Sequence, residues 1–380
     1  MYNTINTKHK YEMMRSTFIT ACERAFINCV CQGGKAYYQE IAALAGVSRS
    51  TVSRVINGYG NVPEQTRRKV MRVVEQYGYV PHASARVLAG GNNSVIGLFM
   101  VDCKSGTAGR KMSLSGYFSP FLAGTIDSAS GLGLHVLACM VASSADYADV
   151  QRIFLEQTVA GGIFIGEQNS SELKKIIRLG CKVVVVDGGM ECGGAVAVNA
   201  DNFSGAYQMT KYLIELGHRR IAHIAGPQSQ LSAQERLCGY RKALEEAGLP
   251  FVPELVECGD FMREGGRKAT RALLERTAQS APTAVFFGND SMALGGMEVI
   301  REKGLSIPED ISIAGFDNVE LAQYSQPALT TVCLPFQEMS SLAVHGLEDL
   351  INGRIAEGCT AQYRVPVEIV KRDSCAAPRV

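Results

Sequence analysis

The chain has 380 residues, with 38 Lys and Arg against 37 Asp and Glu, and is long enough for a small domain beside a two-lobed one. No apolar run approaches the ~18 residues of a membrane helix, and the N-terminus lacks a secretory apolar region, so we expect a cytoplasmic protein with no membrane partner. Twelve cysteines are scattered. Only Cys29 and Cys31 lie close together, without a nearby histidine, so we expect no metal site and no cofactor.

The charge is unevenly divided along the chain. Residues 35–90 hold eight Lys and Arg against three Glu, a net charge of +5, whereas residues 91–380 hold 26 against 32, a net charge of −6. Attraction to phosphate supplies much of the affinity of DNA-binding proteins. The basic segment is therefore a candidate nucleic-acid-binding region, while the acidic remainder fits any soluble core.

Residues 1–34 contain one possible helix, around residues 17–29. It does not continue into the pattern that follows. We expect residues 1–34 to be a poorly ordered extension, or to result from a translation start assigned too far upstream. An accessory helix that contacts DNA is the alternative.

Residues 38–57, YQEIAALAGVSRSTVSRVIN, predict two short helices joined by a glycine turn. Apolar residues recur at helical spacing in both: Ile41, Leu44 and Ala45, then Val52, Val55 and Ile56. Gly46 lets the backbone reverse without a Cβ clash, and Ser48 can cap the second helix. This pattern is typical of a helix-turn-helix.

The other face of the second helix carries hydrogen-bond donors and no carboxylate. Such groups reach guanine edges and phosphate oxygens in a major groove, which is wide enough to admit a helix. The candidate DNA-binding residues here are Ser48, Arg49, Ser50, Thr51, Ser53, Arg54 and Asn57. The alternative is an ordinary solvated polar face.

Two further segments follow. Residues 62–78 predict a third helix, with Pro63 at its start and an apolar stripe of Val70, Val73, Val74 and Tyr77. Pro81 then precedes HASARVLAG. Since isolated helices need roughly 12–15 residues, a helix this short should form only when a partner holds it.

Three motifs in order, AGVSRSTVSRVIN, VPEQTRRKV and YGYVPHASARVLAG, resemble the DNA-binding head of the LacI/GalR (lactose-repressor) family of bacterial transcription regulators. The resemblance implies a helix-turn-helix domain over residues 35–80, a hinge helix and linker over 81–94, and an effector-binding, dimerising core over 95–380. It also implies that the hinge helix folds when two copies meet on the operator. Ala85 and Leu88 would then contact DNA, with Leu88 wedged into the minor groove, although Leu88 could instead pack on the core.

From residue 95 the pattern alternates between strands and helices. Apolar strand-like runs occur at residues 94–101, 134–141, 161–165, 182–187, 219–226, 254–258, 283–287 and 311–315. Buried runs rich in Val and Ile, each followed by a helix, predict parallel sheets with helices on both faces. The expected fold is an all-α helix-turn-helix head plus an α/β two-lobed, periplasmic-binding-protein-like core, with four strands in each lobe.

Ligands of open parallel sheets bind at the carboxyl ends of the strands, and the cleft between two lobes is the natural site. Polar or aromatic side chains follow four of the predicted strands: Asp102, Asp187, Asn289, Asp290, Phe316 and Asp317. Asp201 is expected to cap a helix that begins at Phe203. The resemblance implies effector-binding roles for Asp187, Asn289, Asp317 and also Arg236, in ERLCGYRKAL.

The loop at residues 103–116 is longer than the turn that precedes the aromatic pair, Tyr117 and Phe118, in many members of the family. It leaves the first-lobe effector contacts open, namely Asp102, Tyr117 and Phe118. Arg110 or Lys111 in this loop could recognise a phosphate group.

The predicted function is that of a transcription regulator, a repressor, which binds double-stranded operator DNA as a homodimer. Its operator affinity would be controlled by a polar effector, a sugar or sugar derivative, with sugar phosphates and nucleobase-like compounds also fitting the residue types. A dinucleotide-dependent enzyme would need a G-x-G-x-x-G turn directly after a strand, whereas Gly131 and Gly133 precede a strand and lack the third glycine. We therefore expect no enzyme. A cytoplasmic sugar-binding or carbohydrate-acting protein with the same core is the alternative.

Overall fold

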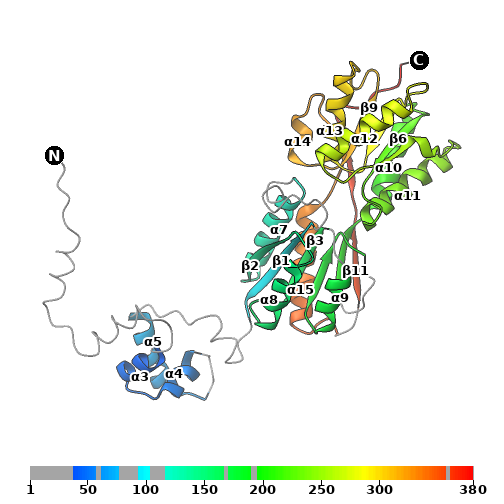
Figure 1. Ribbon diagram of the computed structural model, residues 1–380. Coiled ribbons are helices and arrows are strands. Elements are labelled where there is room, and N and C mark those ends of the chain that lie inside the picture. Colours follow the sequence, from blue (N-terminus) through cyan, green and yellow to red (C-terminus); the bar gives the residue numbers. More distant parts are fainter. Residues whose placement is uncertain are drawn as a thin grey trace, which may run out of the picture. The chain divides into compact units, whose positions relative to one another are not determined.

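The computed structural model describes residues 37–56, 61–76, 93–102, 116–166, 170–189, 195–356 and 360–379. The chain divides into two compact units, separated between Asn93 and Ser94, whose elements are labelled in Figure 1. Several predicted features lie outside the described residues: the extension at 1–34, Asn57, Ala85, Leu88, Arg110 and Lys111.

The described residues of the first unit form the helices α3 (Tyr37–Ala45), α4 (Arg49–Ile56) and α5 (Glu64–Gln76). Their shared core is formed by Ile41, Ala42, Val52, Val55, Val62 and Val70. Gly46 joins α3 to α4 with φ +66°, a backbone conformation that glycine adopts without strain. The helix-turn-helix prediction is thereby confirmed, and α5 begins directly after Pro63.

The second unit has two lobes. The sheet of the first lobe is wholly parallel, with strand order β11-β5-β4-β3-β1-β2. Its strands are β1 (Val95–Val101), β2 (His135–Val141), β3 (Gly162–Gly166), β4 (Val183–Val186), β5 (Val196–Ala200) and β11 (Ala361–Val365). Side chains alternate between its faces, so Leu98 and Phe99 enter different cores.

Helices cover both faces of the first sheet. On one face α7 (Phe118–Gly131) packs beside α15 (Phe336–Ile351), as Figure 1 shows. On the other, α8 (Asp146–Leu155) and α9 (Ser170–Arg178) supply Tyr147, Val150, Phe154, Leu173 and Ile176 to the core.

The sheet of the second lobe has the order β12-β10-β9-β8-β6-β7, with only β12 antiparallel to its neighbour. Its strands are β6 (Ile221–Ala225), β7 (Val256–Cys258), β8 (Ala284–Phe287), β9 (Ser312–Asp317), β10 (Thr330–Cys333) and β12 (Glu368–Val370). One face is covered by α10 (Asn202–Glu215) and α11 (Leu231–Glu246), the other by α12 (Arg263–Arg276) and α13 (Asp290–Glu302). The short elements η1 (Pro253–Leu255) and α14 (Glu320–Tyr324) complete the lobe.

The prediction of parallel sheets with helices on both faces is confirmed, but the count of four strands per lobe is wrong. Each sheet has six strands, and β5, β10, β11 and β12 were not predicted. The chain also crosses between lobes after β5, after β10 and after β11. These strands are only three to five residues long, which leaves little room for a recognisable pattern, and three central residues of β11 are exposed.

The two helices α10 and α11 approach each other closely at Gly239. A Cβ at this position would lie 2.2 Å from the carbonyl oxygen of Phe203 and 2.8 Å from the amide nitrogen of Tyr207. Both atoms belong to the α10 backbone, which cannot rotate away as a side chain can.

We predict that Gly239→Ala lowers the free energy of unfolding by about 2–3 kcal/mol, because the overpacked helices must separate. Gly131→Ala is the matched control, since nothing lies within 4 Å of a Cβ built there. That variant should be neutral or gain up to about 1 kcal/mol. Urea denaturation followed by circular dichroism checks both, and equal effects of the two substitutions would contradict the close approach.

Candidate functional site

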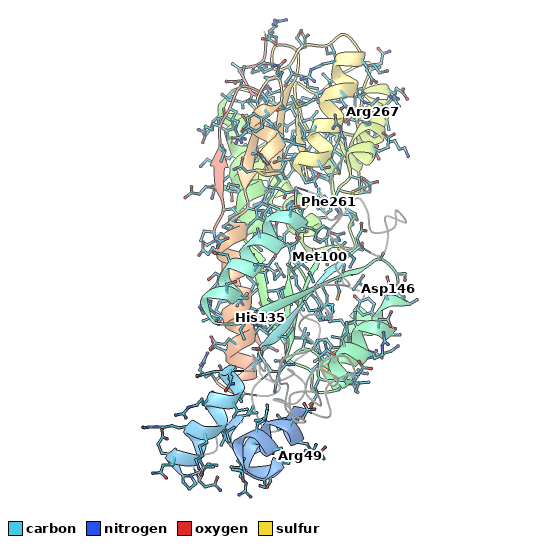
Figure 2. The ribbon with its side chains drawn as sticks, turned by 90° about the vertical axis from the view of Figure 1, so that its left-hand side faces the viewer. Arg49, Met100, His135, Asp146, Phe261 and Arg267 are labelled. Atoms are coloured by element: carbon cyan, nitrogen blue, oxygen red, sulfur yellow. The ribbon has the colours of Figure 1, made fainter. Side chains whose placement is uncertain are left out.

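Helix α4 presents a donor-rich face opposite its buried Val52 and Val55. Arg49, Ser50 and Arg54 are exposed, and Figure 2 labels Arg49 on this helix. The backbone amide of Thr51 donates to Ser48 Oγ at 3.1 Å, which confirms the expected cap. The Ser48 hydroxyl also lies 2.8 Å from the hydroxyls of Ser50 and Thr51, so these three residues brace the start of the helix.

No carboxylate occurs on α4. On α5, by contrast, Arg68 Nε donates to Glu64 at 3.1 Å, and Arg67 Nε lies 4.0 Å from the same carboxylate. The charge of these two arginines is partly balanced within the helix. Arg49 and Arg54 are thus the better placed cations for contact with a nucleic acid.

Four residues form a polar cluster between the lobes, the interlobe cluster: Tyr117 and Asp187 of the first lobe, and Arg236 and Asp317 of the second. Asp187 directly follows β4, and the Tyr117 hydroxyl donates to its Oδ2 at 2.8 Å. Asp317 ends β9 and Arg236 lies on α11. Electrostatic interactions of Tyr117 with Asp187, Asp317 and Arg236 join the two halves of the cluster.

Both cluster aspartates occupy backbone conformations that favour glycine, with φ +58° at Asp187 and +112° at Asp317. Strained residues of this kind persist only where the surroundings hold them. Asn199 on β5 exchanges two hydrogen bonds with Gly188, at 3.0 and 3.2 Å. Asp290 accepts from the Val319 amide at 2.9 Å and so holds the turn after Asp317.

Arg236 is 3% exposed. Its Nε donates to Asn202 Oδ1 at 2.9 Å and its Nη1 to the Gly288 carbonyl at 2.5 Å. The guanidinium carbon lies 3.8 Å from the centre of the Phe316 ring. Nη1 is also 3.6 Å from Asp317 Oδ1, which is an ion pair rather than a hydrogen bond.

Asp317 is 2% exposed, and its Oδ1 finds no hydrogen-bond donor in the described part of the chain. Burial raises the pKa of Asp317 well above its ordinary value, Arg236 opposes the rise, and Asp290 and Asp187 add to it. Burial also raises the pKa of Tyr117, with Asp187 the next cause. An unsatisfied carboxylate oxygen in a buried site is costly and is a ready acceptor for a ligand hydroxyl.

Several predicted ligand contacts have other roles in this structure. Phe316 is fully buried, and the Arg236 guanidinium lies over its ring. Asn289 caps α13, accepting from the Met292 amide at 2.9 Å, and its Nδ2 donates to the Phe261 carbonyl at 3.0 Å. Phe118 is 7% exposed and packs edge-on to Tyr117.

The remaining predicted residues are placed as follows. Asp102 follows β1, half-buried, and its amide donates to the Val141 carbonyl at 2.9 Å. Asp201 caps α10, as predicted, accepting from the Ser204 amide at 3.1 Å.

Sequence reasoning missed three residues beside the cluster. Ser232 lies one turn before Arg236 on α11, and its buried Oγ has no hydrogen-bond partner among the described residues. Phe261 lies in the loop after β7, its ring centre 5.7 Å from the Arg236 guanidinium, and Figure 2 shows it at the boundary of the lobes. Asn202 holds Arg236. The i, i+4 spacing from Arg236 on α11 could have indicated Ser232. The position of Phe261 shortly after the predicted strand at 254–258 could have indicated that residue.

Within the described residues, no helix has the length and apolar character needed to cross a membrane. The same residues contain no group of three or more His, Cys, Asp and Glu side chains arranged to hold a metal ion.

A basic helix-turn-helix joined to a two-lobed core with a polar interlobe cluster defines a ligand-responsive DNA-binding protein. Residues 38–82 match the lacI family of bacterial regulatory proteins, and residues 210–375 match a periplasmic binding protein-like domain. The chain is 34% identical over 321 residues to the HTH-type transcriptional regulator CelR of Thermobifida fusca. The aligned region covers 83% of this chain and 92% of CelR.

Two solved structures are similar along most of the chain. A complex of the transcriptional regulator CelR with cellobiose has a TM-score of 0.69 and 30% identity, covering 89% of this chain and 99% of that one. The lac repressor dimer bound to operator and the anti-inducer ONPF has a TM-score of 0.76 and 28% identity, covering 91% and 100%. The chain belongs to the LacI family and is a DNA-binding transcriptional regulator. Because its relatives are regulators, the expectation that it is not an enzyme is confirmed.

Asp290 should make the free energy of unfolding depend on pH. It is fully buried, and Thr331 Oγ1 donates to its Oδ1 at 2.5 Å. Burial raises the pKa of Asp290 to about 7, against the lowering effect of Thr331 and the backbone amides of Val319 and Asn318.

Between the ordinary aspartate pKa and about 7, the folded protein holds a proton on Asp290 that the unfolded chain has released. The free energy of unfolding should therefore fall as pH rises through this window. Asp290→Asn should remove this contribution, so its stability relative to wild type should increase from pH 4 to pH 7, by at most about 4 kcal/mol. Urea denaturation of both proteins at several pH values measures the difference. A difference that does not change with pH would refute the assignment.

Proposed function

We propose that the protein is a repressor that binds operator DNA as a homodimer in the cytoplasm and responds to a small neutral polyhydroxylated effector, a sugar or sugar derivative. The observation that carries the effector proposal is the buried Asp317 oxygen, which has no donor among the described residues. It lies beside the buried Arg236 and interacts electrostatically with Asp187.

The composition of the interlobe cluster favours neutral hydroxyls over anions. Asp187 and Asp317 accept hydrogen bonds and Arg236 donates them. Hydroxyl groups of a ligand suit this set, because each hydroxyl can both donate and accept. Two carboxylates against one guanidinium disfavour a bound phosphate, because like charges repel strongly in a buried site. Two relatives support this class: the CelR structure is a cellobiose complex, and a LacI family regulator from Enterococcus faecium has bound ribose. Phe261 and Ser232 would complete the ligand contacts.

For DNA, we propose that Arg49, Ser50 and Arg54 contact base edges. Ser48, Thr51, Ser53 and Asn57 would orient the helix on the phosphates, and Ala85 and Leu88 would contact the minor groove. The exposure of Arg49 and Arg54 on a face without carboxylates supports this division.

A dimer would place two heads on a near-palindromic operator, which one short helix-turn-helix cannot read alone. The lac repressor to which the chain is similar is a dimer on its operator.

Leu321 and Tyr324, one turn apart on α14, are 60% and 70% exposed, an unusual degree of exposure for large apolar side chains. They are candidate dimer contacts.

We predict that Arg54→Ala loses about 1–3 kcal/mol of binding free energy on the preferred operator and relaxes sequence preference, because a bidentate base contact is removed. Lys69→Ala on α5 is the control and should weaken all duplexes about equally. The preferred operator comes from selection of randomised duplexes, and fluorescence anisotropy at fixed salt measures the affinities. Equal losses on selected and random DNA for Arg54→Ala would exclude base readout by this residue.

The effector class can be tested by measuring the Tm of the protein in the presence of cellobiose, ribose, sugar phosphates and purines. A neutral sugar should raise the Tm of wild type, and Arg236→Ala and Asp317→Ala should abolish the rise, since each removes a hydrogen-bonding partner of the ligand. Arg267→Ala is the control, because Arg267 lies on α12 in a surface network with Glu298 and Glu302. A rise that survives both cluster substitutions would place the effector elsewhere, and a stronger response to the phosphorylated sugar would overturn the preference for a neutral ligand.

A further inference from the structure

The side chain that fixes the Arg236 guanidinium comes from the hinge between the lobes. Asn202 is the first residue of α10, and the chain crosses from the first lobe to the second immediately before it. Its Oδ1 accepts from Arg236 Nε at 2.9 Å. The direction in which Arg236 donates therefore depends on how the Asn202 amide is turned.

The orientation of the Asn202 amide is set by acceptors on its nitrogen side. Nδ2 donates to the Ala200 carbonyl at 3.2 Å and to Glu235 Oε2 at 3.4 Å. A flipped amide would face two acceptors with its oxygen and present its nitrogen to a guanidinium, and both arrangements are unfavourable. Glu235 thus helps to hold the oxygen of Asn202 toward Arg236.

Glu235 is itself held from the opposite lobe. Arg364 Nη2 donates to Glu235 Oε1 at 2.8 Å, and Arg364 Nη1 lies 3.7 Å from Asp201 Oδ1. Arg364 is on β11, which pairs with β5 in the sheet of the first lobe, whereas Glu235 is on α11 of the second. The ion pair crosses the hinge and, through Glu235 and Asn202, continues to Arg236.

We infer that Asn202, Glu235 and Arg364 form a positioning chain that sets the guanidinium of Arg236 according to the relative orientation of the lobes. When the lobes turn about the hinge, β11 moves with the first sheet and carries Arg364 toward or away from Glu235. The effector arginine is then held differently in the two orientations, which gives a ligand the differential affinity that allosteric control requires. The inference rests on the proposed function, in which Arg236 binds the effector.

The chain offers a closely matched control arginine. Arg364 is 51% exposed and has two carboxylate partners in different lobes. Arg354 is 53% exposed and also has two carboxylate partners, Glu348 and Asp349, which belong to α15 of its own lobe. Substituting glutamine at each position removes a half-exposed charge in both proteins but interrupts the hinge only in Arg364→Gln.

The first readout is binding of cellobiose and D-ribose to the full-length protein, measured by calorimetry with the sugar that binds wild type more tightly. Arg364→Gln should weaken binding about two- to fivefold, and Asn202→Ala about tenfold or more, while Arg354→Gln should leave it unchanged. Glu235→Gln combined with Arg364→Gln should weaken binding no more than either alone, because both interrupt one link. Equal effects of Arg364→Gln and Arg354→Gln, or additive effects in the double variant, would overturn the positioning chain.

The second readout needs no sugar. The Nε–H resonance of Arg236, identified by its loss in Arg236→Lys, should exchange slowly with solvent in wild type. Exchange should become at least about tenfold faster in Asn202→Ala and measurably faster in Arg364→Gln, but not in Arg354→Gln. Unaltered exchange in Asn202→Ala would refute the inference even if neither sugar binds. If a sugar binds equally well to Arg236→Ala, the proposed effector site fails instead, and the exchange rates still decide the positioning chain.

Discussion

The interlobe cluster is organised around one buried guanidinium, that of Arg236. Taking a charged group such as that of Arg236 out of water costs several kcal/mol unless partners replace the lost hydration. Asn202 and the Gly288 carbonyl accept hydrogen bonds from it, and the Phe316 ring lies under it. Hydrogen bonds to charged groups contribute about 1.5–3 kcal/mol each and a desolvated cation–π contact about 2 kcal/mol. These contacts offset much of the cost, and the ion pair with Asp317 adds to them.

The arrangement around Arg236 explains why some residues at strand ends form the framework of the site. Phe316 supports the guanidinium, and Asn289 ties the start of α13 to the loop that carries Phe261. Asp317, the next residue after Phe316, has an oxygen without a donor among the described residues. The two neighbours contact the same guanidinium in different ways, since Phe316 supports it with its ring and Asp317 forms an ion pair with it.

Local features of the fold were predictable because their causes are local. Gly46 and Ser48 form the turn and cap that their residue types require, and the valine-rich run at 183–186 is a buried parallel strand. Asp187 and Asp317 lie at the ends of strands of different sheets, and their electrostatic interaction agrees with the expectation that the carboxyl ends of the strands in both lobes face the space between the lobes.

The features that sequence reasoning missed depend on contacts between distant residues. β11 has exposed central residues and joins β5 more than 160 positions earlier in the chain, and no periodicity indicates which sheet a short strand will join. The hydrogen bond from Arg236 to Asn202 spans 34 positions. The contacts of Phe316 and Asp317 with Arg236 likewise depend on the packing of α11, which lies about 80 positions earlier in the chain.

The pKa of Asp317 connects the geometry to regulation. Burial raises the pKa of Asp317, the carboxylates of Asp290 and Asp187 add to the rise, and Arg236 opposes it. In the proposed function, a ligand hydroxyl that donates to Asp317 would stabilise the ionised carboxylate. Because Asp187 and Tyr117 belong to the first lobe and Asp317 and Arg236 to the second, a ligand bonded to all four would favour one relative orientation of the lobes. That preference would be the thermodynamic basis on which effector binding alters affinity for DNA.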